Sequence, residues 1–412
     1  NGGSWGGYAW GTNPLTAVNP TTPTQLGFPS PGGDYLFSVP DAFHILSDGK
    51  AFAYEAVLVD GFFDEYTGNL VITQGYYDDG TSLFDYSQEL FPFDISAGGD
   101  PVRIVNSKVA FHPDGQTGYL AMLTNNGSNE LADLAYYPIL FKTTDGGANW
   151  DGPYNVQLGG PHGLPAVLNY LTDDLIERLF EPPLPDRTEI IFTTAFDMDV
   201  AVDINGNPHI SFVVGVRGGN DWSIITSFTE EPELGCQGLI ALIHAASYGD
   251  MGAWYADTLT RPYTFRGTYP GSTGNDLSED LRPYISVTPD ASKLFFSWQN
   301  TRIDNVGDNN APDIYCTGYR VSDMSYTEMF NVTAFTPLMW QSWMATGSYY
   351  VFDHGGEYEI PFVCQTMNPA NNIDPVTFKY VDEFRITDDD FGFWVSTHEF
   401  EENLITVSQN FP

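Results

Sequence analysis

Short runs of alternating apolar and polar residues dominate the chain, and turns rich in Gly, Asp, Asn and Pro separate them. Four runs share one layout: an apolar segment, a turn built on Asp or Asn, and a second apolar segment. They cover residues 42–57, 109–123, 200–214 and 284–298. Alternation with period two is typical of half-buried strands, and Asp and Asn tolerate the positive φ of tight turns, so each run predicts a β-hairpin. A weaker fifth copy covers residues 356–365.

Helical periodicity is convincing only between residues 164 and 180, which precede Pro182 and Pro183. Asp173 and Asp174 stand where the first turn of a helix accepts negative charge. The pattern therefore predicts one short helix inside a loop insertion.

The spacing of the four hairpins indicates a repeated unit. Their turn residues, Asp48, Asp114, Asn205 and Asp290, lie 66, 91 and 85 positions apart. Repeated hairpins predict an all-β fold, a six- or seven-bladed β-propeller with an extended N-terminal arm. A pair of β-sandwiches is the alternative, because sandwiches also consist of short alternating strands.

The composition of the first residues differs from that of the rest, with many Gly, Pro, Thr and aromatic residues. We expect an extended arm over residues 1–33 and the β-propeller over residues 34–403. Residues 404–412 are then a linker into a further segment.

The charge balance excludes several functions. The 412 residues include 54 Asp and Glu but 15 Lys and Arg, for a formal charge of −39. Such a chain repels nucleic acid phosphates and anionic lipids. Its apolar runs are too short for insertion into a membrane. Carboxylates in excess favour solubility in salty water and binding of Ca²⁺, which indicates an extracellular protein.

Cysteine and histidine indicate no metal centre. The three cysteines are too few for a disulfide scaffold or a cysteine-rich zinc site, and either one disulfide or three buried thiols remain open. None of the seven histidines forms an H-x-x-x-H pair, and we expect structural roles for His44, His112 and His209.

One octapeptide carries a family resemblance. Residues 143–150 read TTDGGANW, and Thr143, Asp145, Gly147 and Trp150 match the Ser/Thr-x-Asp-x-Gly-x-x-Trp pattern. This resembles the Asp-box, or BNR repeat, of sialidase-like propellers. The resemblance implies a structural turn away from any active site.

A loop rich in oxygen ligands follows later in the chain. Residues 295–320 resemble strand pairs of secreted Asp-box-like propellers. Within them, closely spaced carboxylate and amide side chains suit Ca²⁺, a hard cation that prefers oxygen. The predicted calcium ligands are Asp304, Asn305, Asp308, Asn310 and Asp313. Residues 388–390, three adjacent aspartates, are a second candidate.

The sialidase resemblance does not extend to catalytic residues. Sialidases use three arginines, a Tyr–Glu pair and an acidic Asp, with the first arginine in an F-R-I-P motif near the N-terminus. The nearest string here, residues 384–387, reads FRIT and lies near the C-terminus. The resemblance therefore implies the scaffold without that active site.

The last residues resemble a secretion signal. Residues 404–412 read LITVSQNFP, which is similar to the opening of the C-terminal sorting domain of type IX secretion in Bacteroidota and relatives. This implies export by the type IX machinery to the cell surface. Three short acceptor patterns agree with a surface glycoprotein: N-linked at Asn126 and Asn331, and O-linked at Thr258.

These features predict a non-catalytic extracellular surface protein. It would bind a glycan or a surface protein, or self-associate into a surface assembly, with Ca²⁺ as its cofactor. The alternative is a glycoside hydrolase on a sialidase-like scaffold, whose carboxylate pair the sequence does not single out.

Overall fold

The structure is a computed structural model, and it describes the parts of the chain that follow. They are residues 28–29, 35–36, 42–46, 49–58, 66–78, 80, 83–92, 104–124, 135–220, 223–228, 236, 238–249, 251–265, 267–268, 278–279, 281–301, 309–366, 374–381 and 384–393. The linker predicted over residues 404–412 lies outside them, as does almost all of the predicted arm.

Three four-stranded antiparallel sheets come first, and in each the strands pair in chain order. The first sheet consists of β3 (Ala42–Ile45), β4 (Lys50–Leu58), β5 (Tyr66–Asp78) and β6 (Leu83–Pro92). The second consists of β7 (Ile104–Phe111), β8 (Gly118–Thr124), β9 (Tyr137–Thr143) and β10 (Asp151–Asn155). The third consists of β11 (Phe192–Val202), β12 (Pro208–Val216), β13 (Ile240–Ala246) and β14 (Tyr255–Thr260).

The C-terminal part forms a fourth and a fifth sheet, and the described residues also form three smaller sheets, one of them near the N-terminus. The fourth sheet consists of β17 (Tyr284–Val287), β18 (Lys293–Asn300), β19 (Asp313–Arg320), β20 (Ser325–Thr327) and β28 (Phe391–Phe393), with β21 (Phe330–Asn331) on β19. The fifth consists of β22 (Trp343–Gly347), β25 (Phe362–Thr366) and β26 (Thr377–Val381). The small sheets pair β23 (Phe352–Asp353), β24 (Glu357–Glu359) and β27 (Arg385–Thr387), β1 (Phe28–Pro29) with β2 (Tyr35–Leu36), and β15 (Gly267–Thr268) with β16 (Ser278–Glu279).

The four predicted hairpins are confirmed. Each forms the first two strands of one of the first four sheets: β3–β4, β7–β8, β11–β12 and β17–β18. The fifth hairpin, predicted over residues 356–365, is wrong. Its halves, β24 and β25, belong to different sheets. Pro361 stands between them, and the chain runs on from one sheet into the next without a turn.

Two helices replace the single predicted helix. They are α1 (Pro165–Asn169) and α2 (Asp173–Leu179), and both lie between β10 and β11. The break occurs because the Thr172 side chain accepts the N–H of Leu175 and starts a new helix as its N-cap. Two 3₁₀ turns, η1 (Arg187–Glu189) and η3 (Asp388–Asp390), complete the described elements.

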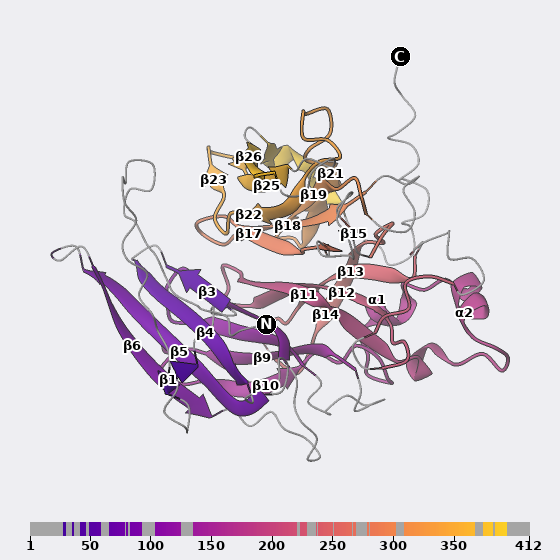
Figure 1. Cartoon of the computed structure of the whole chain (residues 1–412), viewed down its shortest axis with the longest axis horizontal. Helices are drawn as coiled ribbons and strands as arrows, with labels where there is room; N and C mark the ends of the chain where they lie inside the picture. Colours follow the sequence, from indigo (N-terminus) through magenta and orange to yellow (C-terminus); the bar gives the residue numbers. More distant parts are fainter. Residues whose placement is uncertain are drawn as a thin grey trace.

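The sheets succeed one another in an all-β, propeller-like arrangement (Figure 1). The first strand of each sheet contacts the first strand of the next: β3 contacts β7, β7 contacts β11, β11 contacts β17, and β17 contacts β22. The segment after β22 returns to the first sheet, because the Tyr349 ring lies 4.6 Å from that of His44 on β3. Six or seven blades stay a prediction.

The third sheet is buried on both faces. Every residue of β12 and β13 is buried. Phe212 belongs to a core shared with the first and second sheets, whereas Val213 belongs to one shared with the fourth. All three cysteines are buried free thiols, which decides between the two open alternatives. No helix in the described residues is long and apolar enough to span a membrane.

Candidate functional site

A carboxyl group lies where the first strands of the sheets meet. Asp199 on β11 is 8% exposed, and its Oδ2 accepts the backbone N–H of Ile285 on β17 at 2.8 Å. Burial raises the pKa of Asp199 to about 6, although the charge of Lys108 on β7 acts in the opposite direction. Three neighbouring sheets therefore fix one carboxyl that titrates close to neutral pH.

Aromatic side chains close this centre. The negative charge of Asp199 acts on both Tyr284 and Tyr349, and burial is the main reason why the pKa of each tyrosine is raised. The Tyr349 ring stands perpendicular to the rings of His44 and Tyr350. Burial also lowers the pKa of His44 to about 4, so its imidazole is neutral. Within the described residues, the Tyr349 hydroxyl and His44 Nε2 have no hydrogen-bond partner.

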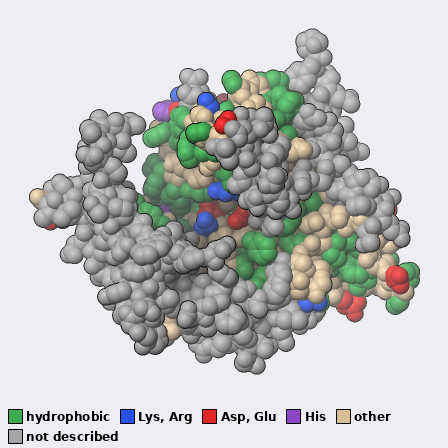
Figure 2. Space-filling view, in the orientation of Figure 1, with side chains coloured by type: hydrophobic (Ala, Val, Ile, Leu, Met, Phe, Trp, Pro, Cys, Tyr) green, Lys and Arg blue, Asp and Glu red, His purple; other side chains and the backbone are tan. Residues whose placement is uncertain are grey.

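The centre offers acid–base chemistry but little room. A carboxyl with a pKa near 6 can donate or accept a proton at neutral pH. Figure 2 shows basic and acidic side chains close together near the middle of the face of the molecule that it presents. Asp199, however, is only 8% exposed, and a substrate needs open space beside the reacting group.

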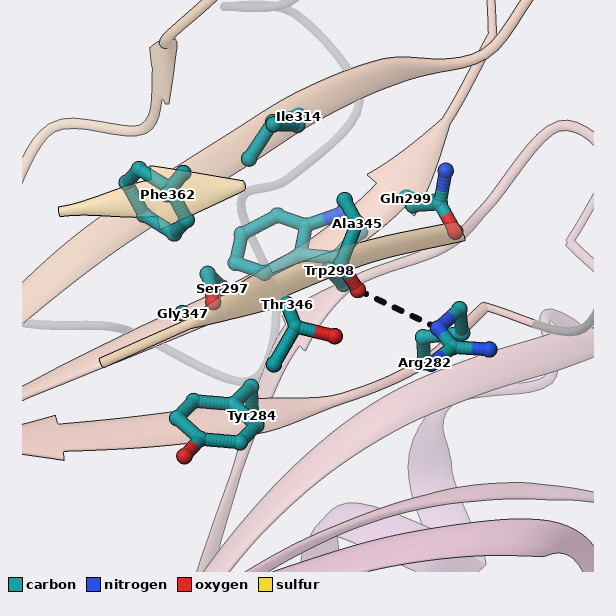
Figure 3. A pocket seen from close by; sticks show the side chains of 10 residues that line it. All are labelled: Arg282, Tyr284, Ser297, Trp298, Gln299, Ile314, Ala345, Thr346, Gly347 and Phe362. Carbon is teal, nitrogen blue, oxygen red and sulfur yellow. Dashed lines mark hydrogen bonds between the residues drawn. The ribbon is translucent and has the colours of Figure 1, made fainter. Parts of the chain in front are cut away.

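A small cavity lies beside this centre, between the fourth and fifth sheets, and Tyr284 is among the residues that line it (Figure 3). It has about 190 Å³ of empty space, and Trp298, Gln299 and Arg282 are among the residues that line it. The Nε1–H of Trp298 and the Oε1 of Gln299 have no partner in the described part of the chain. The part of this space that a water molecule can occupy measures about 10 Å³, so the cavity has room for about one water molecule and not for a sugar.

The predicted Asp-box residues form one turn between β9 and β10. Thr143 donates its hydroxyl to Asp145 and accepts the N–H of Gly147, each at 2.9 Å. Gly147 has φ of +86°, and the indole N–H of Trp150 bonds its carbonyl. The Trp150 ring meets Tyr54 of the first sheet edge-on at 5.5 Å. The turn thus locks the second sheet onto the first, and its membership of the Asp-box family stays a prediction.

The predicted calcium ligands are not gathered in the described residues. Asp304, Asn305 and Asp308 lie outside the described ranges. Asp313 is buried, and its carboxylate accepts bonds from three donors on the 331–340 segment: Asn331 Nδ2, the Thr333 hydroxyl and the Trp340 N–H. These bonds occupy the carboxylate that was expected to bind Ca²⁺. No group of three His, Cys, Asp or Glu side chains in the described ranges could hold a metal ion. Asn310 is exposed, and calcium binding by these residues stays a prediction.

The predicted glycosylation sites differ in accessibility. Thr258 on β14 is 6% exposed and lies opposite Ile243, so its hydroxyl is not available in the folded protein. Asn331 is half-buried, and its amide donates to Asp313 at 2.9 Å. Asn126 lies outside the described residues. Burial follows from the strand position, which a short acceptor pattern does not encode.

Two groups of buried polar residues carry no signal in the sequence that would identify them. Asp199 is one of 54 acidic residues, and no motif marks it. His209 and His244 are in hydrogen-bond contact although 35 positions separate them. Only the pairing register of β12 with β13 brings these two rings together.

Comparisons with known proteins give no family. No protein-family model matches the chain, and no curated protein matches it. The structural neighbours are sialidase-like and glycoside hydrolase folds. A Trypanosoma rangeli sialidase in complex with sialic acid is 12% identical over 87% of this chain and 49% of its own, with a TM-score of 0.42.

Two further neighbours have similar scores. A Hadza microbial sialidase is 10% identical over 83% of this chain and 58% of its own, with a TM-score of 0.39. A Bacteroides ovatus glycosyl hydrolase is 11% identical over 92% of this chain and 94% of its own, with a TM-score of 0.39. The chain spans about half the length of the two sialidases. At these TM-scores the likeness does not establish an activity for this chain.

Proposed function

We propose that the chain is a non-catalytic, extracellular surface protein that binds a neutral glycan. The observation that supports this most is the burial of Asp199, which is 8% exposed and whose charge acts on the nearby Tyr284 and Tyr349. Most glycoside hydrolases use two carboxyl groups on either side of the scissile bond, with room between them for the sugar. Secretion through the type IX system, implied by residues 404–412, is part of the same proposal.

The binding surface that we propose is the outer face of the fifth sheet. Phe378 and Tyr380 on β26 are 65% and 49% exposed, and Val363 on β25 is 41% exposed. Tyr380 pairs with Val363, and Phe378 pairs with Gln365, so these side chains share one face. Aromatic rings stack on the apolar face of a pyranose, which presents C–H groups.

The charge of the protein restricts the ligand. A formal charge of −39 repels sialylated or sulfated glycans. A neutral polysaccharide meets no such barrier. Self-association of so acidic a chain needs divalent cations between copies, which is why Ca²⁺ stays in the proposal as a bridging ion.

Affinity electrophoresis in gels that contain neutral or sulfated polysaccharide tests the proposal. We expect a neutral polysaccharide to retard the wild type and the double variant F378A/Y380A to lose at least tenfold in affinity. Phe352→Ala, at another exposed aromatic residue on β23, is the matched control and should bind as the wild type does. Equal binding by F378A/Y380A and the wild type would exclude this face.

A glycoside hydrolase is the second candidate, and one observation favours it. β11 carries another half-buried carboxyl, Asp197, two positions before Asp199. Alternate residues of a regular strand lie about 7 Å apart, close to the separation of about 6.5–9.5 Å in inverting enzymes. Asp197 lies where the pairing of β11 is irregular, between Thr194 and Met198. Release of reducing sugar by the wild type, and its loss in D199N, would establish this candidate.

A further inference from the structure

A continuous line of hydrogen bonds joins five titratable side chains between the third and fourth sheets. We call it the five-residue network; in order, its members are Asp203, His209, His244, Tyr326 and Asp257. Asp203 lies in the turn between β11 and β12, and the two histidines lie on β12 and β13. Asp257 lies on β14, whereas Tyr326 comes from β20 of the fourth sheet.

Four contacts hold the network together. His209 Nε2 lies 3.3 Å from Asp203 Oδ2, and His209 Nδ1 lies 2.8 Å from His244 Nε2. His244 Nδ1 lies 2.6 Å from the Tyr326 hydroxyl, which lies 2.9 Å from Asp257 Oδ2. Both histidines and Tyr326 are buried, so water does not substitute for any of these partners.

The register of the third sheet produces this alignment. His244 is opposite Ser211 on β12 and opposite Asp257 on β14. Because alternate residues of a strand share a face, His209, His244 and Asp257 all face the fourth sheet. The fourth sheet contributes Tyr326, which pairs with Tyr319 in the same sheet.

The number of hydrogens that the four contacts need determines the protonation state of the network. Each of the four contacts joins two atoms that can accept, so each needs one hydrogen between them. Two neutral imidazoles and one hydroxyl supply three hydrogens when both carboxylates are ionised. The fourth contact is satisfied only if the network holds one additional proton.

Four arrangements accommodate this proton, on Asp203, His209, His244 or Asp257, and all contain the same four hydrogens; two of them illustrate the range. With the proton on Asp257, every donor points toward Asp203: Asp257 to Tyr326, Tyr326 to His244, and so on along the line. With the proton on His209, this imidazolium donates to Asp203 and to His244, and the remaining donors point toward Asp257. Transfer along the line interconverts the two without loss of a bond.

We propose that the five-residue network is a proton-binding site, which retains one proton in the folded protein and thereby makes the contact between the third and fourth sheets dependent on pH. No ligand other than the proton is required. The site is separate from the proposed glycan surface and from Asp199, so the two proposals stand or fall independently.

Tyrosines are the main titratable side chains that the described part of the chain places around the network. Four tyrosines lie around the network, and burial is the main reason why the pKa of three of them is raised: Tyr119, Tyr248 and Tyr319. The fourth, Tyr255, contacts the Tyr248 ring. The apolar ring of Phe296 lies 4.3 Å from that of His244. The hydroxyls of Tyr119, Tyr248 and Tyr319 therefore stay protonated. The 2.7 Å bond between Tyr248 and Tyr319 lies outside the network.

The directions of the pKa shifts agree with one retained proton. Burial raises the pKa of Asp257, so this carboxyl holds a proton more readily than usual. Burial and the nearby His209 lower the pKa of His244 well below its ordinary 6.5, so it stays neutral. Burial alone would raise the pKa of Asp203, but bonds from His209 and Asn207 lower it, so Asp203 stays ionised.

The retained proton gives stability a characteristic pH profile. Above the ordinary histidine pKa of about 6.5, the same five groups in the unfolded chain hold three hydrogens, one fewer than in the folded network. Stability then falls as pH rises, with the unfolding equilibrium constant increasing toward tenfold per pH unit. Below about pH 6, both histidines of the unfolded chain are charged and hold five hydrogens, so stability falls as pH drops. The contribution of the network is therefore greatest near pH 6.5.

Tyr326→Phe tests the proposal, with Tyr319→Phe as the matched control. Without the Tyr326 hydroxyl, the two neutral histidines satisfy the remaining two contacts and no additional proton is needed. Urea unfolding between about pH 7 and about pH 8 should show the wild type losing stability relative to Y326F, toward tenfold in the equilibrium constant. Y319F, which removes a neighbouring hydroxyl outside the network, should track the wild type at every pH. A constant ratio between wild type and Y326F would overturn the proposal.

A second variant covers the case in which Y326F does not fold. In Asp257→Asn the amide N–H takes the place of the protonated carboxyl, so the network is complete without the retained proton. D257N should be as stable as the wild type near pH 6.5 and more stable at pH 8. A D257N whose stability follows that of the wild type across this range would equally overturn the proposal.

Discussion

The third and fifth sheets differ in how much of their surface is buried. The central strands of the third sheet, β12 and β13, are buried along their whole length, because cores cover both faces. On the edge strand β26 of the fifth sheet, four of five residues are exposed. Burial on two faces forces each polar group inside to find a partner, whereas an open face leaves aromatic rings available for a ligand.

The side chains of the two sheets show the same difference in burial. His209 and His244 lie within the third sheet, and both are bonded to other side chains. On the fifth sheet, Phe378 keeps most of its surface in water. Exposure of a large ring contributes nothing to folding, so such a ring is explained better by binding.

Truncating one phenylalanine in each sheet gives the largest expected effect. Phe212→Ala on β12 should lower the free energy of unfolding by about 3–5 kcal/mol, because it leaves a cavity in a two-sided core. Phe378→Ala on β26 should change it by no more than about 0.5 kcal/mol. Urea denaturation of both variants measures the difference. Similar losses in the two variants would mean that the fifth sheet is also covered on its outer face.

Replacement of the buried carboxyl of β11, Asp199, should have a smaller effect on stability. Because the pKa of Asp199 rises from 3.8 to about 6 on folding, the folded protein holds a proton that the unfolded chain has lost between these values. Stability present below about pH 4 is therefore lost as pH rises through 6, by up to about 3 kcal/mol. Asp199→Asn should raise stability at pH 8 by about 1–3 kcal/mol and leave it nearly unchanged at pH 4. Thermal unfolding at the two pH values measures this, and a D199N that is less stable at pH 8 would contradict it.

The smallest effect belongs to an exposed carboxyl. The side-chain bond from Arg320 is the main reason why the pKa of Asp323 is lowered to about 2. The sign is opposite to that of Asp199: stability is present above the ordinary carboxyl pKa and lost as pH falls through 2. Asp323→Asn should cost less than about 1 kcal/mol at pH 7, since solvent screens this pair. Denaturation in low and high salt should show this small cost shrinking with salt, and a cost that grows would contradict an exposed pair.

Local chemistry explains which parts of the fold the sequence predicts. Each of the four confirmed hairpins contains its own turn, so the residues that decide it are neighbours in the chain. The pattern over residues 356–365 looked alike, yet β24 and β25 pair with strands elsewhere. Sequence alternation reports that a segment is extended, but not which strand it joins.

The candidate sites depend on contacts between distant segments. Asp199 acquires its raised pKa from burial by strands of three sheets, and Asp313 is occupied by donors 18 or more positions away. The turn at Thr143–Trp150 is the exception, because its bonds span at most four residues. For this reason its internal geometry follows from the motif, whereas the five-residue network does not.

One assay tests the central claim that this protein binds a glycan without cleaving it. The wild type, D199N and F378A/Y380A are each incubated with the neutral polysaccharide that retards the wild type, and bound protein and released reducing sugar are measured in the same samples. The account predicts binding by the wild type and D199N, loss of binding by F378A/Y380A, and no release of sugar by any of them. Sugar released by the wild type and not by D199N would contradict it and assign the activity to the centre of the sheets.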